Sequence, residues 1–427
     1  MKALKWLTRI GPAFVIAAVV LGPGSVTTMT KMGAKHGYAM LWLPLLAGVL
    51  MAGFVTLFMR FGISADRSFL AHCAAVCGRP FAALCGLSMF YIATAFQFGN
   101  NIGVATALDS LLRPASAAGT QPTQPASPVP AWAWPVAFNA AALIFLFAFR
   151  RIYAVLEKMM TALVAIMLVA FFLNLFFAKP SLAGIGRGLV PSIPAGLDWM
   201  IAAGLVATTF SIVGAIFQTY LVRARGWKRD DFGKGVADSA SGIGMLMLIS
   251  MVVMVTSAAV LHPRGVQVTS AGDMATQLET FFGASARVIF CVGFAAAAFS
   301  SFLVNAMIGG TLLADGFGWS EDINSLPAKL CSAASLLVGM AVAILVTHFR
   351  TLDHATALVA AQAGTLLAVP LAILAALLVL LYPRRAGVKR LGPFVEMFVF
   401  LGLAVLIAIA VRSYARTIPS LLKMLGG

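Results

Sequence analysis

Charged residues are scarce in this sequence. Only 10% of its 427 residues are Asp, Glu, Lys or Arg, while 61% are hydrophobic. A chain with so few charges cannot cover a large soluble core with polar side chains. Its apolar runs are instead long enough to cross about 30 Å of hydrocarbon, so we predict an all-α, polytopic membrane protein without a soluble domain.

Carboxylates are missing from the middle of these apolar runs. The chain has 14 acidic residues, and four of them lie near the ends of runs: Asp109, Glu157, Asp315 and Glu396. An acid inside the membrane is the expected ligand for a hard divalent cation and the expected carrier of a coupled proton. The polar groups that remain inside the apolar runs are backbone carbonyls and side-chain amides. They suit a small neutral or zwitterionic solute, or a cation that keeps much of its hydration shell.

Cysteine and histidine are also few, with five of each. The cysteines lack the paired spacing of a disulfide framework, and His72, Cys73 and Cys77 lack a fourth metal ligand. We therefore assign no residue to a metal site. The sequence has no nucleophile-elbow, zinc-protease or phosphate-loop signature either, so we expect neither an enzyme nor a cofactor.

Hydropathy predicts about eleven membrane spans. They lie near residues 11–33, 38–60, 80–111, 132–149, 152–178, 199–222, 240–261, 284–314, 328–347, 354–382 and 391–412. About 19 of the 30 Lys and Arg fall on the side of the N-terminus, which the positive-inside rule places in the cytoplasm. We expect an external C-terminus, a flexible external loop over 114–130, and a location in the inner (cytoplasmic) cell membrane.

The net charge of +16 does not require a nucleic-acid partner. Basic loops that face anionic lipids of the bilayer explain most of this charge. We therefore expect the lipid bilayer as a partner and no nucleic acid, and the sequence leaves the oligomeric state open.

The first span contains a break. Residues 21–28 read LGPGSVTT, where Pro23 has no N–H and each glycine costs about 1 kcal/mol against alanine in a helix. The sixth span has a second polar interruption around Gly214. Interrupted helices at corresponding positions of two halves are typical of inverted-repeat transporters, and we interpret the first break in this way; a kinked structural helix is the alternative. We predict repeats over 11–178 and 199–382 and an added helix at 391–412, all within one transporter domain.

Polar side chains recur on single faces of several spans. Gln97, Asn100 and Asn101 are spaced i, i+3, i+4 in the third span, and Ser211, Ala215 and Gln218 share a face of the sixth. Each group alone is also compatible with interhelical hydrogen bonding. Their recurrence on both broken spans favours a shared cavity. The candidate substrate-binding residues are Gly22, Gly24, Ser25, Thr28, Gln97, Asn100, Asn101, Ala215, Gln218, Asn305 and Gln362.

Four stretches carry a family resemblance. GPAFVIAAVVLGPGSVTTMTKMGAKHGYAMLW (11–42), VGAIFQTYLV (213–222), AAAAFSSFLVNAMIGGTLLADGF (295–317) and AQAGTLLAVPLAILA (361–375) resemble the first, sixth, eighth and tenth spans of the Nramp (natural-resistance-associated macrophage protein) divalent-metal transporters. The resemblance covers most of the chain in order and spacing. It implies the LeuT-like inverted repeat of five plus five helices, with the first and sixth helices interrupted.

This sequence departs from the Nramp pattern at the functional positions. The family's metal-binding aspartate and asparagine are matched by Gly22 and Ser25, its methionine by Gln218 and its histidine by Tyr220, which we add to the candidate site. Without the thioether and the carboxylate, preference for soft transition metals is lost. The family's third-span acid, a further group tied to proton coupling, lacks a counterpart too.

We therefore expect a secondary transporter that works by alternating access around a neutral polar site and is not a Mn or Fe carrier. Two alternatives remain open. The first is transport of a divalent cation, Mg²⁺ or Mn²⁺, that is bound largely hydrated. The second is a receptor or scaffold that keeps the fold without transport.

Overall fold

The structure is a computed structural model that describes residues 22–112, 129–130, 132–148, 150–349, 353–381 and 393–425. Within these ranges the regular secondary structure consists of helices, without any strand. The first half of the first predicted span and most of the predicted 114–130 loop lie outside the described residues.

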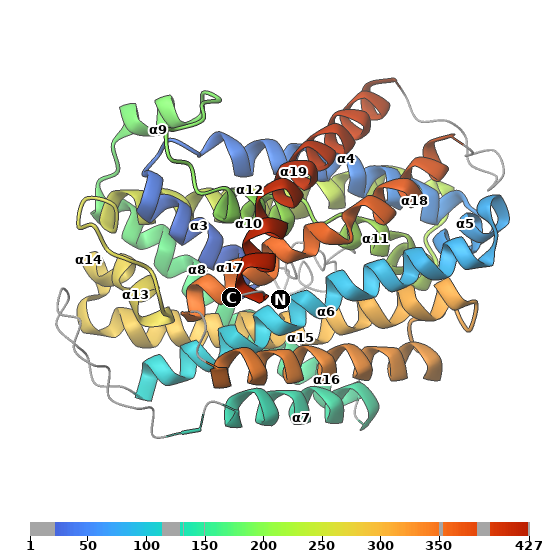
Figure 1. The fold of residues 1–427 in the computed structure, drawn as a ribbon, viewed down its shortest axis with the longest axis horizontal. Helices are drawn as coiled ribbons and strands as arrows, with labels where there is room; N and C mark the ends of the chain where they lie inside the picture. Colours follow the sequence, from blue (N-terminus) through green and yellow to red (C-terminus); the bar gives the residue numbers. More distant parts are fainter. Residues whose placement is uncertain are drawn as a thin grey trace, which may run out of the picture.

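The helices are named as in Figure 1. Their bounds are α3 (Pro23–His36), α4 (Trp42–Ser64), α5 (Phe69–Cys77), α6 (Arg79–Leu112), α7 (Ala133–Ala148), α8 (Arg150–Ala178), α9 (Leu182–Gly188), α10 (Trp199–Thr209), α11 (Ile212–Ala224), η1 (Arg229–Asp231), α12 (Phe232–Val260), α13 (Ala271–Ala275), η2 (Thr276–Leu278), α14 (Glu279–Phe282), η3 (Gly283–Ser285), α15 (Ala286–Phe317), α16 (Leu326–Phe349), α17 (His354–Gly364), η4 (Thr365–Leu367), α18 (Val369–Leu381) and α19 (Pro393–Leu425).

Each predicted span coincides with a helix or with a pair of consecutive helices. The sixth span is the pair α10 and α11, and the tenth is the pair α17 and α18, which is bent by 47°. By length and apolar composition, six helices of the described residues are able to cross a membrane, or up to eight if each bent pair counts as one span. This count is below eleven partly because α3 and α7 are short within the described ranges, at 14 and 16 residues.

Two long helices, α6 and α15, pack against each other along much of their length. Figure 1 shows them running side by side, with α16 and α7 alongside. Glycines bring the two backbones together: a Cβ on Gly86 would lie 2.8 Å from the Leu312 carbonyl oxygen, and one on Gly316 would lie 2.9 Å from that of Ala82. Such close approach through small residues is how membrane helices gain packing contacts without a hydrophobic driving force.

Polarity is distributed as in a membrane protein. Large apolar side chains such as Leu84 of α6 and Ile144 of α7 are exposed on the outside of the bundle, whereas amides such as Gln97 and Gln218 are buried inside. The pair α10 and α11 is the most enclosed of the candidate spans in the described part of the chain, with 89% of its apolar window buried. The broken sixth span therefore occupies the interior, where irregular backbone is tolerated.

Candidate substrate site

Two helix breaks meet at one place in the bundle. Gly22 is extended (φ −69°, ψ 179°) and Pro23 is the first residue of α3, where its missing N–H costs nothing. Between α10 and α11, Phe210 and Ser211 leave the helical conformation. The Ser211 hydroxyl then accepts a hydrogen bond from the Gly214 N–H at 3.3 Å, which caps the new helix. The start of α3 and the predicted interruption of the sixth span thus each have a local cause; the residues before Gly22 lie outside the described ones.

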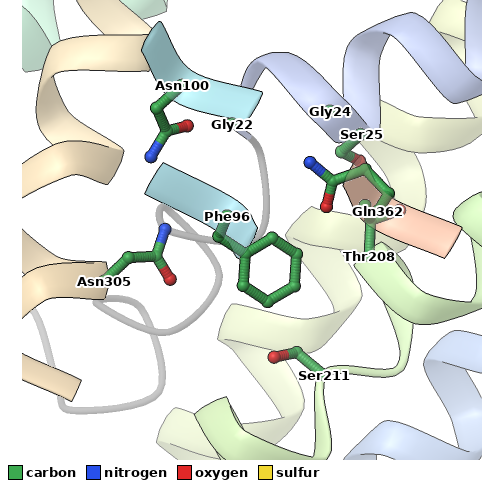
Figure 2. Close-up of a pocket in the computed structure, with 9 residues that line it drawn as sticks. All are labelled: Gly22, Gly24, Ser25, Phe96, Asn100, Thr208, Ser211, Asn305 and Gln362. Carbon is green, nitrogen blue, oxygen red and sulfur yellow. The ribbon is translucent and has the colours of Figure 1, made fainter. Parts of the chain in front are cut away.

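A pocket lies between these breaks, and Figure 2 shows its walls. The cavity at its centre has a volume of about 20 Å³, room for about one or two water molecules. Five helices and the two breaks contribute to it. The lining residues are Gly22, Gly24, Ser25, Phe96, Asn100, Thr208, Ser211, Asn305 and Gln362.

The pocket lining is neutral. Its side chains are amides, hydroxyls and one phenyl ring, and Figure 2 shows Asn100 and Asn305 on one side, Gln362 on the other and Phe96 between them. The Gln362 Oε1 atom is buried without a hydrogen-bond partner among the described residues. No group of three or more His, Cys, Asp or Glu in the described part of the chain is arranged to hold a metal ion. The pocket therefore offers neutral oxygen atoms and amide N–H groups to a substrate.

Helix ends add partial charges of both signs. The N-termini of α3 and α11 carry partial positive charge, and the C-terminus of α10, beside Thr208, carries partial negative charge. Because these partial charges oppose one another, they leave little net attraction for a bare cation. Recognition in this pocket consequently depends on individual dipoles.

Gln362 fits against two glycines. A Cβ on Gly24 of α3 would come within 2.1 Å of Gln362 Nε2, and a Cβ on Gly99 of α6 would come within 2.8 Å of the same atom. Contacts below 3.0 Å force neighbouring atoms to move. The two glycines therefore create the space in which α17 places its amide beside the start of α3.

The row of amides on α6 divides between the pocket and the helix interfaces. Asn100 lines the pocket, and its Nδ2 donates to Gln97 Oε1 at 3.2 Å. Gln97 Nε2 donates to the Phe302 carbonyl at 2.5 Å, and Asn139 of α7 donates to Asn101 Oδ1 at 2.6 Å. The prediction that all three amides face one cavity thus does not match the geometry. Residues 97 and 101 share the face toward α15 and α7, while residue 100 is turned by about 100° from residue 101.

Four other candidates also lie outside the pocket lining. Thr28 donates to the carbonyl of Ser25 within its own helix at 2.9 Å, and Ala215 is buried in the core. Gln218 is fully buried, and both its amide atoms lack a hydrogen-bond partner among the described residues. Tyr220 donates to Asp315 Oδ2 at 2.5 Å. Six of the twelve predicted residues therefore line the pocket: Gly22, Gly24, Ser25, Asn100, Asn305 and Gln362.

Three lining residues were not among the predicted ones. Ser211 follows from its capping position three residues before Gly214, and Thr208 belongs to the polar stretch that signalled the second break. Phe96 has no signal in the sequence, because a phenylalanine within an apolar run is expected to face lipid or the core.

Sequence comparisons connect this arrangement to known proteins. A family model described as "Natural resistance-associated macrophage protein-like" matches residues 13–416. A divalent metal cation transporter MntH of Yersinia pestis is 24% identical over 311 residues, which are 72% of this chain and 72% of the relative. The protein of the same name from Deinococcus radiodurans is 24% identical over 345 residues, which are 78% of this chain and 75% of the relative.

Solved structures share the fold. A mutant of the Eremococcus coleocola manganese transporter superposes with a TM-score of 0.76 at 17% identity, over 94% of this chain and 85% of that one. The transporter MhsT in complex with L-phenylalanine gives a TM-score of 0.59 at 13% identity, over 95% of this chain and 98% of that one. At these identities the likeness shows the fold alone, and it confirms the predicted LeuT-like arrangement.

Proposed function

This chain belongs to the natural resistance-associated macrophage protein-like family, and we propose that it is a secondary transporter that carries a divalent metal cation by alternating access. Of the substrate classes left open by the sequence, the divalent cation has the better support. Two relatives are named divalent metal cation transporters, and a structure with the same fold is a manganese transporter. The sequence-based preference for a non-metal solute is the weaker of the two.

Our proposal for how the cation is bound rests on the neutral lining of the pocket between the two helix breaks. A divalent cation that sheds its water needs negative ligands to replace the lost hydration free energy. Neutral carbonyl, hydroxyl and amide oxygens replace only part of it. We therefore infer that the cation keeps much of its hydration shell and touches the protein through water, which suits Mg²⁺ or Mn²⁺ and gives no preference for soft metals.

The size of the cavity adds a requirement. At about 20 Å³ it holds about one or two waters, fewer than the shell of a hydrated divalent ion. We propose that the pocket widens when the ion enters and that Phe96 moves aside, because its ring separates the amides of Asn305 and Gln362 (Figure 2). Ion entry is thus coupled to rearrangement at the centre of the bundle.

We also propose the repeat boundaries and the orientation predicted from the sequence. The repeats are residues 11–178 and 199–382, and the basic loops face the cytoplasm from the inner membrane. The positions of the breaks at Pro23 and at Phe210–Ser211 support the two repeats, since each break falls in the first span of its half.

The test is cation uptake into proteoliposomes. Purified protein is reconstituted around an indicator for Mg²⁺ or Mn²⁺, and uptake is measured over a range of cation concentrations. We expect uptake of both ions, half-saturated in the millimolar range, and a loss of uptake in Asn305→Ala and Gln362→Ala. Uptake of Mn²⁺ that saturates at micromolar concentration would contradict a hydrated ion. Absence of uptake of both ions would contradict cation transport.

A zwitterionic solute is the second candidate, and one observation favours it. The pocket combines two helix N-termini with one helix C-terminus, partners for a carboxylate and an ammonium group respectively. Calorimetric titration with a panel of amino acids, beside Mg²⁺ and Mn²⁺, separates the candidates. Saturable heat from an amino acid and none from either cation would select the solute.

A further inference from the structure

Asp315 is a buried carboxylate near the end of α15. Its exposed fraction is 4%, and three donors reach its side chain. Ser68 Oγ donates at 2.9 Å, Tyr220 Oη at 2.5 Å and the Leu70 N–H at 3.3 Å. A buried carboxylate is stable only when such donors replace its water, so these bonds fix the elements that supply them.

The three donors to the Asp315 side chain come from two elements: Ser68 and Leu70 belong to the start of α5, and Tyr220 belongs to α11. Ser68 is the N-cap of α5, and Leu70 lies in the first turn of the same helix, so Asp315 also meets the positive end of α5. From α6, the Arg79 guanidinium donates to the Asp315 backbone carbonyl at 3.1 Å. Asp315 is thus held firmly to α5 and α6. Its side-chain bond to α11 is the Tyr220 hydroxyl.

The α11 helix connects this carboxylate to the pocket. Ser211 at its N-terminus lines the cavity, and Tyr220 lies nine positions farther along, a distance of about 13 Å on a helix. One turn beyond Tyr220, Arg223 donates to the carbonyls of Ala65 and Arg67 and pairs with Glu321 at 3.3 Å. These Arg223 contacts are more exposed than the buried Tyr220 bond.

We propose that the bond from Tyr220 to Asp315 is a latch that keeps the substrate pocket closed on the face where Ser68, Tyr220 and Asp315 lie. The positive-inside rule makes this face cytoplasmic, because Arg67, Arg79 and Arg223 belong to it. When the bond breaks, α11 separates from the platform of α5, α6 and α15, and the pocket opens. Asp315 acts as a positioning residue that never touches the substrate. The latch rests on the proposed transport function, since opening serves to release the carried ion.

Cys73 is a native reporter of this opening. It lies on α5 with an exposed fraction of 0%, close enough to Asp315 and Tyr220 to interact with both electrostatically. Cys77, on the same helix, is exposed. We therefore expect a maleimide to label Cys77 in every state and Cys73 faster once α11 has moved. The ratio of the two labelling rates, read by peptide mass spectrometry, corrects for differences in protein quality.

The test compares Tyr220→Phe with Thr219→Val in detergent, without substrate. Tyr220→Phe removes the hydroxyl from the latch, whereas Thr219→Val removes a neighbouring hydroxyl that bonds only its own helix, to the Ile216 carbonyl at 2.8 Å. We expect Tyr220→Phe to raise Cys73 labelling about tenfold or more, because a hydrogen bond to a charged group shifts an equilibrium by at least that factor. Thr219→Val should leave labelling unchanged.

Equal labelling in the parent and Tyr220→Phe would overturn the latch, and so would an equal rise in both variants. Asp315→Asn provides a second variant if Tyr220→Phe fails to fold, with an expected rise in labelling of the same direction. Labelling requires no ion. A failed latch is therefore distinguishable from a failed transport proposal, which the uptake assay tests on the unmodified protein.

Discussion

The amide of Gln362 lies directly across Gly24, so close that a Cβ on Gly24 would sit 2.1 Å from Gln362 Nε2. Three helices share this point, because Gly99 of α6 borders the same atom. The start of α3 and the side of α17 that faces the pocket therefore pack closely, because the glycines at positions 24 and 99 have no side chain.

Gly24→Ala should for this reason weaken the protein and its substrate site together. Glycine to alanine in a helix normally stabilises by about 0.4–1 kcal/mol, but here the new methyl displaces Gln362. We expect a lower midpoint of thermal unfolding and at least a tenfold loss of cation uptake. Gly244→Ala on α12 is the matched control, since nothing lies within 4 Å of its Cβ position. A Gly24→Ala protein with parental uptake would show that Gln362 is not part of the site.

Gly22→Asp should strengthen cation binding. Gly22 lines the pocket in an extended conformation that any residue adopts, and aspartate is a favoured N-cap. One carboxylate in a neutral cavity should raise the affinity for Mn²⁺ or Mg²⁺ about tenfold or more, as measured by calorimetric titration. Gly22→Asn has nearly the same shape without the charge and should leave the affinity near that of the parent. Equal affinities in the two variants would place the cation elsewhere.

Substitutions of Gln97 and Asn305 should have opposite effects on the stability of the protein and on its affinity for the cation. Gln97→Ala removes the bond to the Phe302 carbonyl and leaves the Asn100 Nδ2 donor without its acceptor, Gln97 Oε1, which costs about 1–3 kcal/mol of unfolding free energy. Its effect on cation affinity should be small. Asn305→Ala should instead lower the affinity at nearly unchanged stability, because Asn305 faces the pocket. The reverse pattern in thermal unfolding and calorimetry would refute our division of the amides.

His36 should make stability depend on pH. Burial and the neighbouring Lys35 lower the pKa of His36 below its usual 6.5, against the opposing effect of Asp198. Its Nε2 accepts a hydrogen bond from the Asp198 N–H at 3.4 Å, which a protonated ring cannot do. The unfolded chain therefore binds the proton more readily, and the free energy of unfolding should fall as the pH drops below about 6.5.

The measurement is thermal unfolding at about pH 7.5 and about pH 5.5, on either side of the ordinary histidine pKa. In His36→Gln the amide oxygen accepts the same N–H without titrating, so this variant should lose less stability between the two conditions than the parent. Equal losses in the two proteins would show that His36 does not carry the pH dependence.

The helices were predictable because a hydropathy profile locates the apolar runs along the chain, and the bounds of the helices follow these runs closely. The start of α3 and the break in the sixth span were predictable as well, since Pro23 suits the first position of a helix and Ser211 caps a new one. The rotation of each helix about its axis, which decides where its polar side chains point, was not predictable. Gln97 and Asn101 point to neighbouring helices because partners on α15 and α7 satisfy them there, and those partners lie far away in the sequence. The pairing of Tyr220 with Asp315, 95 residues apart, was hidden for the same reason.

The neutral pocket has an electrical consequence. Its lining residues carry no ionised side chain, so in the transport cycle that we propose the empty carrier would return without charge at this site, while the loaded one would move both charges of a divalent cation. A membrane potential of about 100 mV acts on each charge with about 2.3 kcal/mol, hence with about 4.6 kcal/mol on the ion. That work corresponds to an accumulation of about three orders of magnitude. If the proposed cation transport is right, voltage alone, negative inside, is a sufficient driving force for uptake without any gradient of protons.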